Sequence, residues 1–147
     1  MTLRMEPPKT KPELAAQVWQ RLFDFIIATA AERNRILGHH DLTPNDSRAL
    51  FALDGKTGRS MGSLAEEWGC DASYATSVVD RLEHRGLAER RAQPGDRRVK
   101  LAILTAAGAK LRATLARELY KPPHELTDLA TPDLRALWLA VAKLPQH

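Results

Sequence analysis

The sequence lacks the features that define several classes of protein. It contains a single cysteine, which excludes an intramolecular disulfide, and no N-terminal segment has the apolar core of a signal peptide. No apolar run approaches the roughly 18 residues that a membrane-spanning helix needs. Together these absences predict a protein of the reducing cytoplasm.

Motifs of enzymatic chemistry are also missing. The chain has no G-x-S-x-G, no glycine-rich phosphate loop, no H-E-x-x-H, no cysteine–histidine couple, and no carboxylates paired in apolar surroundings. His39 and His40 are adjacent, but no further ligands accompany them at metal-binding spacing. We therefore expect neither an enzyme nor a bound metal or cofactor.

Positive charge is concentrated in one part of the chain. The 147 residues fit one domain and carry a formal net charge of +4. Residues 81–100 contain seven Lys or Arg and three Asp or Glu, so this segment alone has a net charge of +4. The rest of the chain is close to neutral, and the basic segment is typical of a nucleic-acid interface.

Residues 61–85 have the pattern of two short helices joined by a tight turn. Apolar residues at helical spacing predict the first helix over 61–68, and Gly69 would end it. Asp71 is suited to cap a second helix over 72–85, whose outer face carries short polar side chains. This pattern predicts a helix-turn-helix whose second helix enters the DNA major groove. The residues expected to contact bases and phosphates are Ser73, Tyr74, Thr76, Ser77 and Arg81.

A basic β-hairpin is expected directly after this helix-turn-helix. Residues 87–91 and 98–104 have the character of strands, and Gln93-Pro-Gly-Asp96 between them is turn chemistry. We expect all five cations of the hairpin to lie at its tip and the hairpin to act as a wing. Arg97 would enter the minor groove, and Arg90, Arg91 and Lys100 would meet phosphates. The alternative is that those other cations only keep an exposed hairpin soluble. The wing residues assigned to DNA are Arg90, Arg91, Asp96, Arg97, Arg98 and Lys100.

Helices with wide apolar faces are predicted on both sides of this region. Residues 12–37 predict one long helix that begins at Pro12, and further helices are expected from Thr105 to about 120 and from Thr131 onward. A shorter helix is expected to follow the N-cap Thr43 and to end near Leu53 before a turn-rich linker over 54–59. Because few elements remain to cover the apolar faces, dimerisation through the terminal helices is favoured.

The expected organisation has four parts. A flexible basic tail spans 1–11, an N-terminal dimerisation helix and loop span 12–42, and C-terminal dimerisation helices span 106–147. The DNA-binding part between them, 43–105, is mainly helical with a small β-hairpin, which is a winged helix-turn-helix. A dimer of this kind would suit a pseudo-palindromic site with half-sites roughly 34–36 Å apart.

The central residues resemble a known family. The run from Leu64 to Arg91, followed by Asp96, Arg98, Leu104 and Thr105 in the pattern Asp-x-Arg, several residues, Leu-Thr, is similar to the MarR family of bacterial transcriptional regulators. The resemblance implies a homodimeric DNA-binding regulator, most often a repressor. It also implies that Arg98 pairs with acidic or backbone partners to set the wing, with Asp96 holding it or shaping the turn.

The resemblance further implies a small aromatic or phenolic effector. It would bind in the cleft between the dimerisation helices and the DNA-binding region and change the distance between the two recognition helices. The candidate lining residues, all of which could equally be core, are Trp19, Phe23, His39, His40 and Phe51.

Two alternatives remain open. A protein-interaction module could keep the winged fold without binding DNA, although the wing arginines would then have no packing role. Cys70 could be a redox sensor, but it lies in the turn at an ordinarily apolar position without nearby cations in sequence, which favours a buried and inert thiol.

Overall fold

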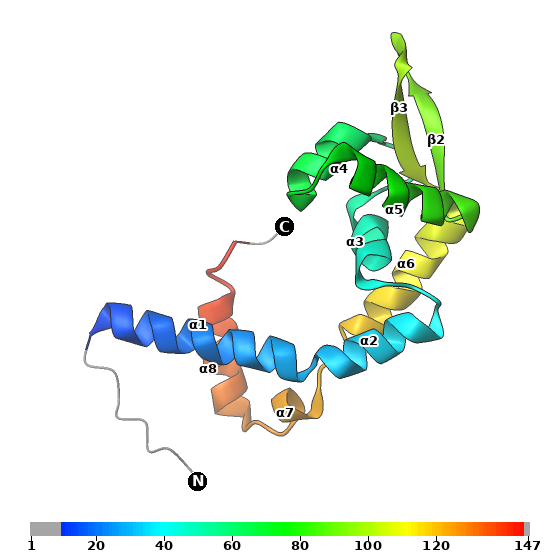
Figure 1. Cartoon of the computed structure of the whole chain (residues 1–147). Coiled ribbons are helices and arrows are strands. Elements are labelled where there is room, and N and C mark those ends of the chain that lie inside the picture. Colours follow the sequence, from blue (N-terminus) through cyan, green and yellow to red (C-terminus); the bar gives the residue numbers. More distant parts are fainter. Residues whose placement is uncertain (1–9, 146–147) are drawn as a thin grey trace.

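The computed structural model describes residues 10–145, which form a mainly helical chain with one small antiparallel sheet (Figure 1). Residues 1–9 and 146–147, which include most of the predicted tail, lie outside the described residues. The helices are α1 (Lys11–Ala28), α2 (Ala30–His39), α3 (Pro44–Ala52), α4 (Met61–Trp68), α5 (Ala72–His84), α6 (Ala106–Leu119), α7 (His124–Thr127) and α8 (Thr131–Val141). The strands are β1 (Arg59–Ser60), β2 (Ala88–Gln93) and β3 (Asp96–Leu104). The predicted fold class, mainly α with a β-hairpin wing, is confirmed.

The hydrophobic core lies in the central part of the chain. Its largest fully buried side chains belong to α3–α6 and to the residue after α3, and they are Leu50, Leu53, Leu64, Val78, Val79, Leu82 and Leu115. Burying a side chain of this size stabilises the fold by about 1.5–3 kcal/mol relative to leaving it exposed. Within the described residues, α1 and α8 contain no buried side chain. The winged region, residues 43–105, therefore packs around this core together with α6, while α1 extends away from it as an arm (Figure 1).

The N-terminal helix is divided, so the prediction of one continuous helix over 12–37 is wrong. α1 ends at Ala28 and α2 starts at Ala30, with Thr29 between them. The Thr29 hydroxyl donates to the Phe25 carbonyl at 2.9 Å and to the Ile26 carbonyl at 3.2 Å, a back-bonding contact that bends helices. The Arg33 guanidinium then donates to the Thr29 hydroxyl and the Ile26 carbonyl, which satisfies backbone oxygen that the break exposes.

Helix starts follow side-chain caps. Thr43 accepts from the backbone of Asp46 and Pro44 is the first helical residue of α3, as predicted. Thr105 likewise caps α6 and accepts from Gly108 N–H at 3.1 Å. α1 begins one residue earlier than predicted, at Lys11, because Thr10 forms a capping box with Glu13.

The hairpin prediction is confirmed, with longer strands than expected. β2 pairs antiparallel with β3 from Ala88↔Leu104 to Gln93↔Asp96, and Gly95 takes a φ of 87° in the turn. A third strand, β1, pairs with the other edge of β3 at the end of the segment predicted to be only a linker. It has two residues and runs directly into α4, too short for its sequence to show a strand pattern.

The C-terminal part turns back from the winged region toward α1. α6 leads away from the hairpin, the short helix α7 makes the corner, and α8 lies next to α1 (Figure 1). The predictions of α6 and of a helix starting at Thr131 are confirmed, whereas α7 was not predicted. Across residues 10–145, no helix is long and apolar enough to span a bilayer.

Candidate nucleic-acid interface

The turn between α4 and α5 has the geometry predicted for a helix-turn-helix. Gly69 adopts the left-handed conformation with φ 64° and ψ 38°, which ends α4 without the strain that a Cβ would add. Two residues later, the Asp71 carboxylate accepts from Tyr74 N–H at 2.7 Å and caps α5. The conformation of Gly69 and the cap at Asp71 therefore set the direction in which α5 starts.

α5 presents a buried face to the core and a polar face to solvent. Ala75, Val78, Val79 and Leu82 are fully buried, as their spacing predicted. On the opposite face Ser73, Tyr74 and Ser77 are exposed, and Thr76 is half-buried. The short hydroxyls and one phenol at the start of the helix allow close approach to base edges and can donate or accept hydrogen bonds.

Two of these polar groups have partners within the protein. The Asn45 side-chain amide, at the start of α3, donates to the Tyr74 phenol oxygen at 2.6 Å. The Ser77 hydroxyl donates to the Tyr74 carbonyl at 2.8 Å. Tyr74 as a residue nevertheless stays 42% exposed, so these contacts orient the side chain without burying it.

Arg81 forms an ion pair with a buried carboxylate on α3. Its Nε and Nη2 atoms lie 3.0 and 2.9 Å from one Asp46 oxygen, and the Asp46 side chain is only 7% exposed. Burial alone would raise the pKa of Asp46, but hydrogen bonds from the Thr43 backbone and hydroxyl and the Arg81 guanidinium outweigh it and lower that pKa. Arg81 thus joins α5 to α3, and its predicted DNA contact would use the exposed remainder of its guanidinium.

Arg90 lies at the base of the hairpin, so the prediction that it belongs to the tip cations is wrong. Its Cα is paired with that of Ala102, and its guanidinium bonds Glu83 and reaches Asp80 at 2.6 Å. With only 18% of the side chain exposed, Arg90 connects the wing to the recognition helix. Any phosphate contact would have to compete with two carboxylates.

The cations at the outer end of the wing are different. Arg97, Arg98 and Lys100 are exposed on β3, and within residues 10–145 none of them forms an ion pair. Arg91, also exposed, pairs with Glu89. Asp96 accepts from the backbone N–H of Arg98 at 3.0 Å, so it shapes the turn through the backbone. The wing therefore carries three cations whose charge is not neutralised by a neighbouring carboxylate.

Sequence reasoning missed the residues that connect α5 to its neighbours. Arg85, the C-cap of α5, donates to the His40 and Asp41 carbonyls at 2.9 and 2.8 Å, in the loop between α2 and α3. Asn45 and Asp46 were missed as well. The only available signal was Asp46 three residues after Thr43, the spacing of a capping box.

The five candidate effector residues do not surround one cavity. Trp19 and Phe23 stack on α1 with ring centroids 6.0 Å apart, whereas Phe51 packs against Tyr120. His40 lies 3.0 Å from the Glu118 carboxylate, and of the five only His39 lines the cleft beside the α1–α2 junction. Cys70 is half-buried against the core. No cluster able to hold a metal ion occurs among the described residues.

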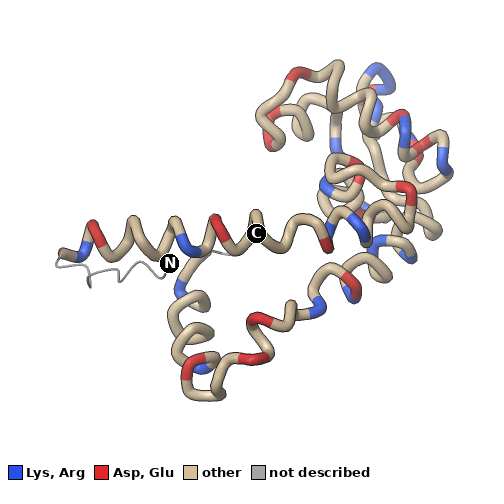
Figure 2. The backbone as a smooth tube through the Cα atoms, turned by 60° about the horizontal axis from the view of Figure 1, so that its bottom comes forward, with Lys and Arg blue, Asp and Glu red and all other residues tan. Residues whose placement is uncertain are grey.

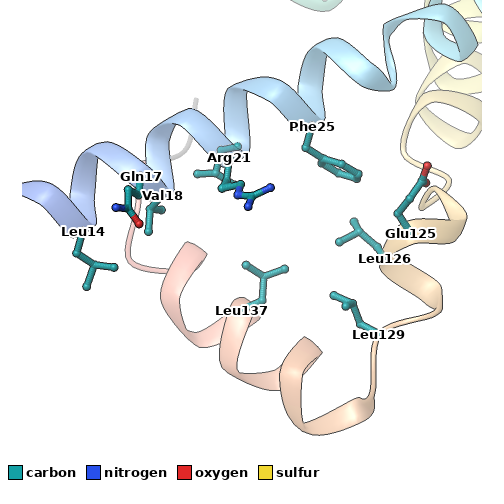
Figure 3. Close-up of a pocket in the computed structure, with 10 residues that line it drawn as sticks. Leu14, Gln17, Val18, Arg21, Phe25, Glu125, Leu126, Leu129 and Leu137 are labelled. Atoms are coloured by element: carbon teal, nitrogen blue, oxygen red, sulfur yellow. The ribbon is translucent and has the colours of Figure 1, made fainter. Parts of the chain in front are cut away.

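Two hollows lie outside the winged region. A cleft of about 950 Å³ separates the α1–α2 junction from the end of α6 and the loop to α7. A second, apolar groove of about 500 Å³ lies between α1 and the C-terminal helices (Figure 3). In it, Leu14 and Val18 of α1 face Leu126, Leu129 and Leu137 from the segment α7–α8.

Lys and Arg are more frequent around the winged region than along the α1 arm (Figure 2).

Sequence comparison identifies relatives of this chain. A sequence model described as MarR family matches residues 40–99. The HTH-type transcriptional regulator MhqR of Bacillus subtilis is 31% identical over 93 residues, which cover 59% of this chain and 64% of MhqR, slightly less than two thirds of it. The uncharacterized HTH-type transcriptional regulator YcgE of the same organism is 30% identical over 125 residues, which cover 84% of this chain and 73% of YcgE.

Solved structures share the fold. The crystal structure of YusO from Bacillus subtilis matches with a TM-score of 0.72 and 22% identity, covering 92% of this chain and 96% of YusO. The S. aureus MepR–DNA complex matches with a TM-score of 0.62 and 20% identity, covering 83% of this chain and 96% of that chain. At these identities the comparison shows a shared fold only. This chain, YusO and MepR have the same arrangement of helices around the winged region.

Proposed function

The chain belongs to the MarR family of transcriptional regulators, and we propose that it binds double-stranded DNA at a specific sequence. The observation that carries this proposal is the exposed polar face of α5 beside the unneutralised wing cations Arg97, Arg98 and Lys100. A helix face of short polar groups serves base contacts, and exposed cations serve phosphates. The fold shared with MepR, whose DNA complex is known, supports the same function.

Each group has a defined role in this proposal. α5 would enter the major groove with Ser73, Tyr74, Thr76 and Ser77 toward the bases, while Arg81 would reach a phosphate from its ion pair with Asp46. Arg97 would enter the minor groove, and Arg91, Arg98 and Lys100 would meet phosphates beside it. Arg90 and Asp96 would act indirectly, by holding the wing against α5 and shaping its turn.

We also propose that the protein acts as a homodimer. Large apolar side chains on the terminal helices are exposed, among them Trp19 at 64%, Ile27 at 58% and Trp138 at 63%. A second copy packed on α1, α8 and the groove between them would cover this surface and present two recognition helices to a pseudo-palindromic site.

Trp138→Asp is expected to convert the dimer to a monomer, because a charge would be buried in the centre of the apolar interface. Light scattering after gel filtration should give twice the chain mass for the wild type and the chain mass for the variant. Glu66→Ala, at an exposed position on α4 outside the terminal helices, serves as control and should remain dimeric. A wild type that elutes as a monomer at micromolar concentration would refute the proposed assembly.

Repression and effector release follow the family resemblance and are proposed on that basis. The cleft of about 950 Å³ has a size suited to a small molecule, with apolar walls from Phe25, Ile36 and Leu119 and polar groups from Arg33 and His39. A phenol or aromatic carboxylate bound there would shift the α1–α2 arm against α6. Such a compound should raise the Kd for DNA in the wild type and raise it less in Ile36→Trp, whose larger side chain occupies part of the cleft.

The decisive experiment selects bound sequences from random duplexes and then measures the affinity for the most strongly selected duplex as the salt concentration is raised. An inverted repeat that is bound less tightly at higher salt would support a dimeric sequence-specific regulator. Equal and weak binding to every duplex would instead favour a winged protein-interaction module.

Arg97→Ala is expected to weaken binding to the selected duplex by roughly 1–3 kcal/mol and to leave the dimer intact. The reason is loss of a minor-groove cation that no carboxylate neutralises. Arg117→Ala removes the same side chain from α6, away from the wing, and should bind DNA like the wild type. The wing assignment fails if Arg97→Ala binds with wild-type affinity at matched salt.

A further inference from the structure

One polar contact at the edge of the proposed interface connects two helices that the core does not join there. The Asn45 side-chain amide, in the first turn of α3, donates to the phenol oxygen of Tyr74 in the first turn of α5 at 2.6 Å. Both residues are exposed. Because neither side chain is needed to fill the core, the contact has no evident packing purpose.

The direction of this hydrogen bond determines whether the Tyr74 phenol can donate a further hydrogen bond. A phenol has one hydrogen to donate and lone pairs to accept. Since Tyr74 accepts from Asn45, its own O–H hydrogen remains available as a donor. Ser77 has the opposite role. Its hydroxyl hydrogen is donated to the Tyr74 carbonyl, so the hydroxyl oxygen can only accept a further hydrogen bond. Two neighbouring groups of the recognition helix therefore have fixed and opposite hydrogen-bonding roles.

Both ends of the Asn45–Tyr74 contact are held in place. The Tyr74 backbone N–H is bound by the capping carboxylate of Asp71 at 2.7 Å. Asn45 lies within the capping box of Thr43 and Asp46, and Asp46 is in turn bound to α5 by Arg81. Asn45 is therefore presented by a turn of helix that is itself attached to α5, so little freedom remains to be lost on binding.

We propose that Asn45 is a positioning residue that determines sequence specificity through Tyr74. It holds the phenol with its O–H free, so that Tyr74 donates to an acceptor on a base edge in the major groove, namely guanine O6 or N7, adenine N7 or thymine O4. The cytosine amino group, a donor, is disfavoured at that position. This inference rests on the proposed DNA binding and adds a second residue, outside α5, to the readout.

The test compares full-length wild type, Tyr74→Phe, Asn45→Ala and the double variant. Bound sequences are selected with each protein. The Kd is then measured for the duplex that the wild type selects and for a random duplex, at one salt concentration. Asn34→Ala, an exposed asparagine on α2, is the matched control. Thermal melting of each variant checks that the fold is retained.

We expect Tyr74→Phe to weaken binding to the duplex that the wild type selects by roughly two- to tenfold for each half-site, the effect of one lost hydrogen bond. Asn45→Ala should weaken it in the same direction, relax the base preference at the same operator position, and leave the random-duplex Kd unchanged. The double variant should bind no more weakly than Tyr74→Phe alone, because both changes remove one contact.

Other outcomes overturn the inference. If Asn45→Ala keeps the wild-type base preference while Tyr74→Phe loses it, Tyr74 reads the base without Asn45. If Asn45→Ala weakens binding to the selected duplex and to the random duplex equally, Asn45 acts on the backbone or on the fold. If the wild type selects no sequence at all, the proposed function itself fails and the inference fails with it.

Discussion

Asp46→Ala is expected to lower the free energy of unfolding by about 3 kcal/mol at neutral pH. The substitution removes a carboxylate that is 93% buried, pairs with Arg81 and forms half of the α3 capping box. Breaking a buried ion pair costs about 3–5 kcal/mol when the remaining charge stays buried. Here the Arg81 side chain is 47% exposed and can recover water, which places the expected cost at the lower end.

The pH dependence of stability gives an independent check. Because the folded-state pKa of Asp46 is lowered, its contribution is fully present above the unfolded pKa of about 3.9 and is lost as pH falls through the folded pKa. Urea unfolding of wild type and Asp46→Asn should therefore differ at pH 7 and converge as the pH falls below the unfolded pKa of about 3.9. Asp128→Ala, an exposed carboxylate, should cost no more than a few tenths of a kcal/mol. A constant difference at every pH would contradict this role.

Gly108→Ala should destabilise the protein by about 2–3 kcal/mol although alanine is the better helix former. A Cβ at this position in the first turn of α6 would lie 2.0 Å from the Leu87 carbonyl oxygen. That carbonyl is fixed, because it also accepts from Thr105 N–H at 3.1 Å. Either α6 or the start of β2 must move, and overpacking of this kind costs about 1–3 kcal/mol. DNA affinity should fall too, because α6 joins the winged region to the C-terminal helices.

Gly38→Ala is the matched control for this effect. Gly38 is also helical, and nothing lies within 4 Å of an added Cβ. The control should gain about 0.5–1 kcal/mol from helix propensity. Thermal melting of both variants at one protein concentration separates the two effects, since the melting temperature of the proposed dimer would depend on concentration. Equal shifts in the two variants would show that the close approach at Gly108 does not limit packing.

Much of the winged region was predictable because its signals are local. Gly69 and Asp71 mark the helix-turn-helix, and Pro94-Gly95 marks the hairpin turn; each acts within a few residues. The apolar spacing of α5 correctly predicted its buried face. The family resemblance read from these residues is confirmed by the match to residues 40–99 and by YcgE.

Other features were decided only by the tertiary structure. β1 exists because β3 offers a free edge some 40 residues further along the chain, and the helix break follows from the Thr29 and Arg33 contacts. The sequence by itself determined the helices and the hairpin of the winged region, the caps at Thr43, Asp71 and Thr105, and which cations belong to the hairpin. It did not determine which cations are neutralised, because Arg81 and Arg90 meet their carboxylates only after α3, α5 and the hairpin have packed. Charges brought together by packing leave no spacing pattern in a sequence, so the distinction between Arg90 and Arg97 is a property of the fold.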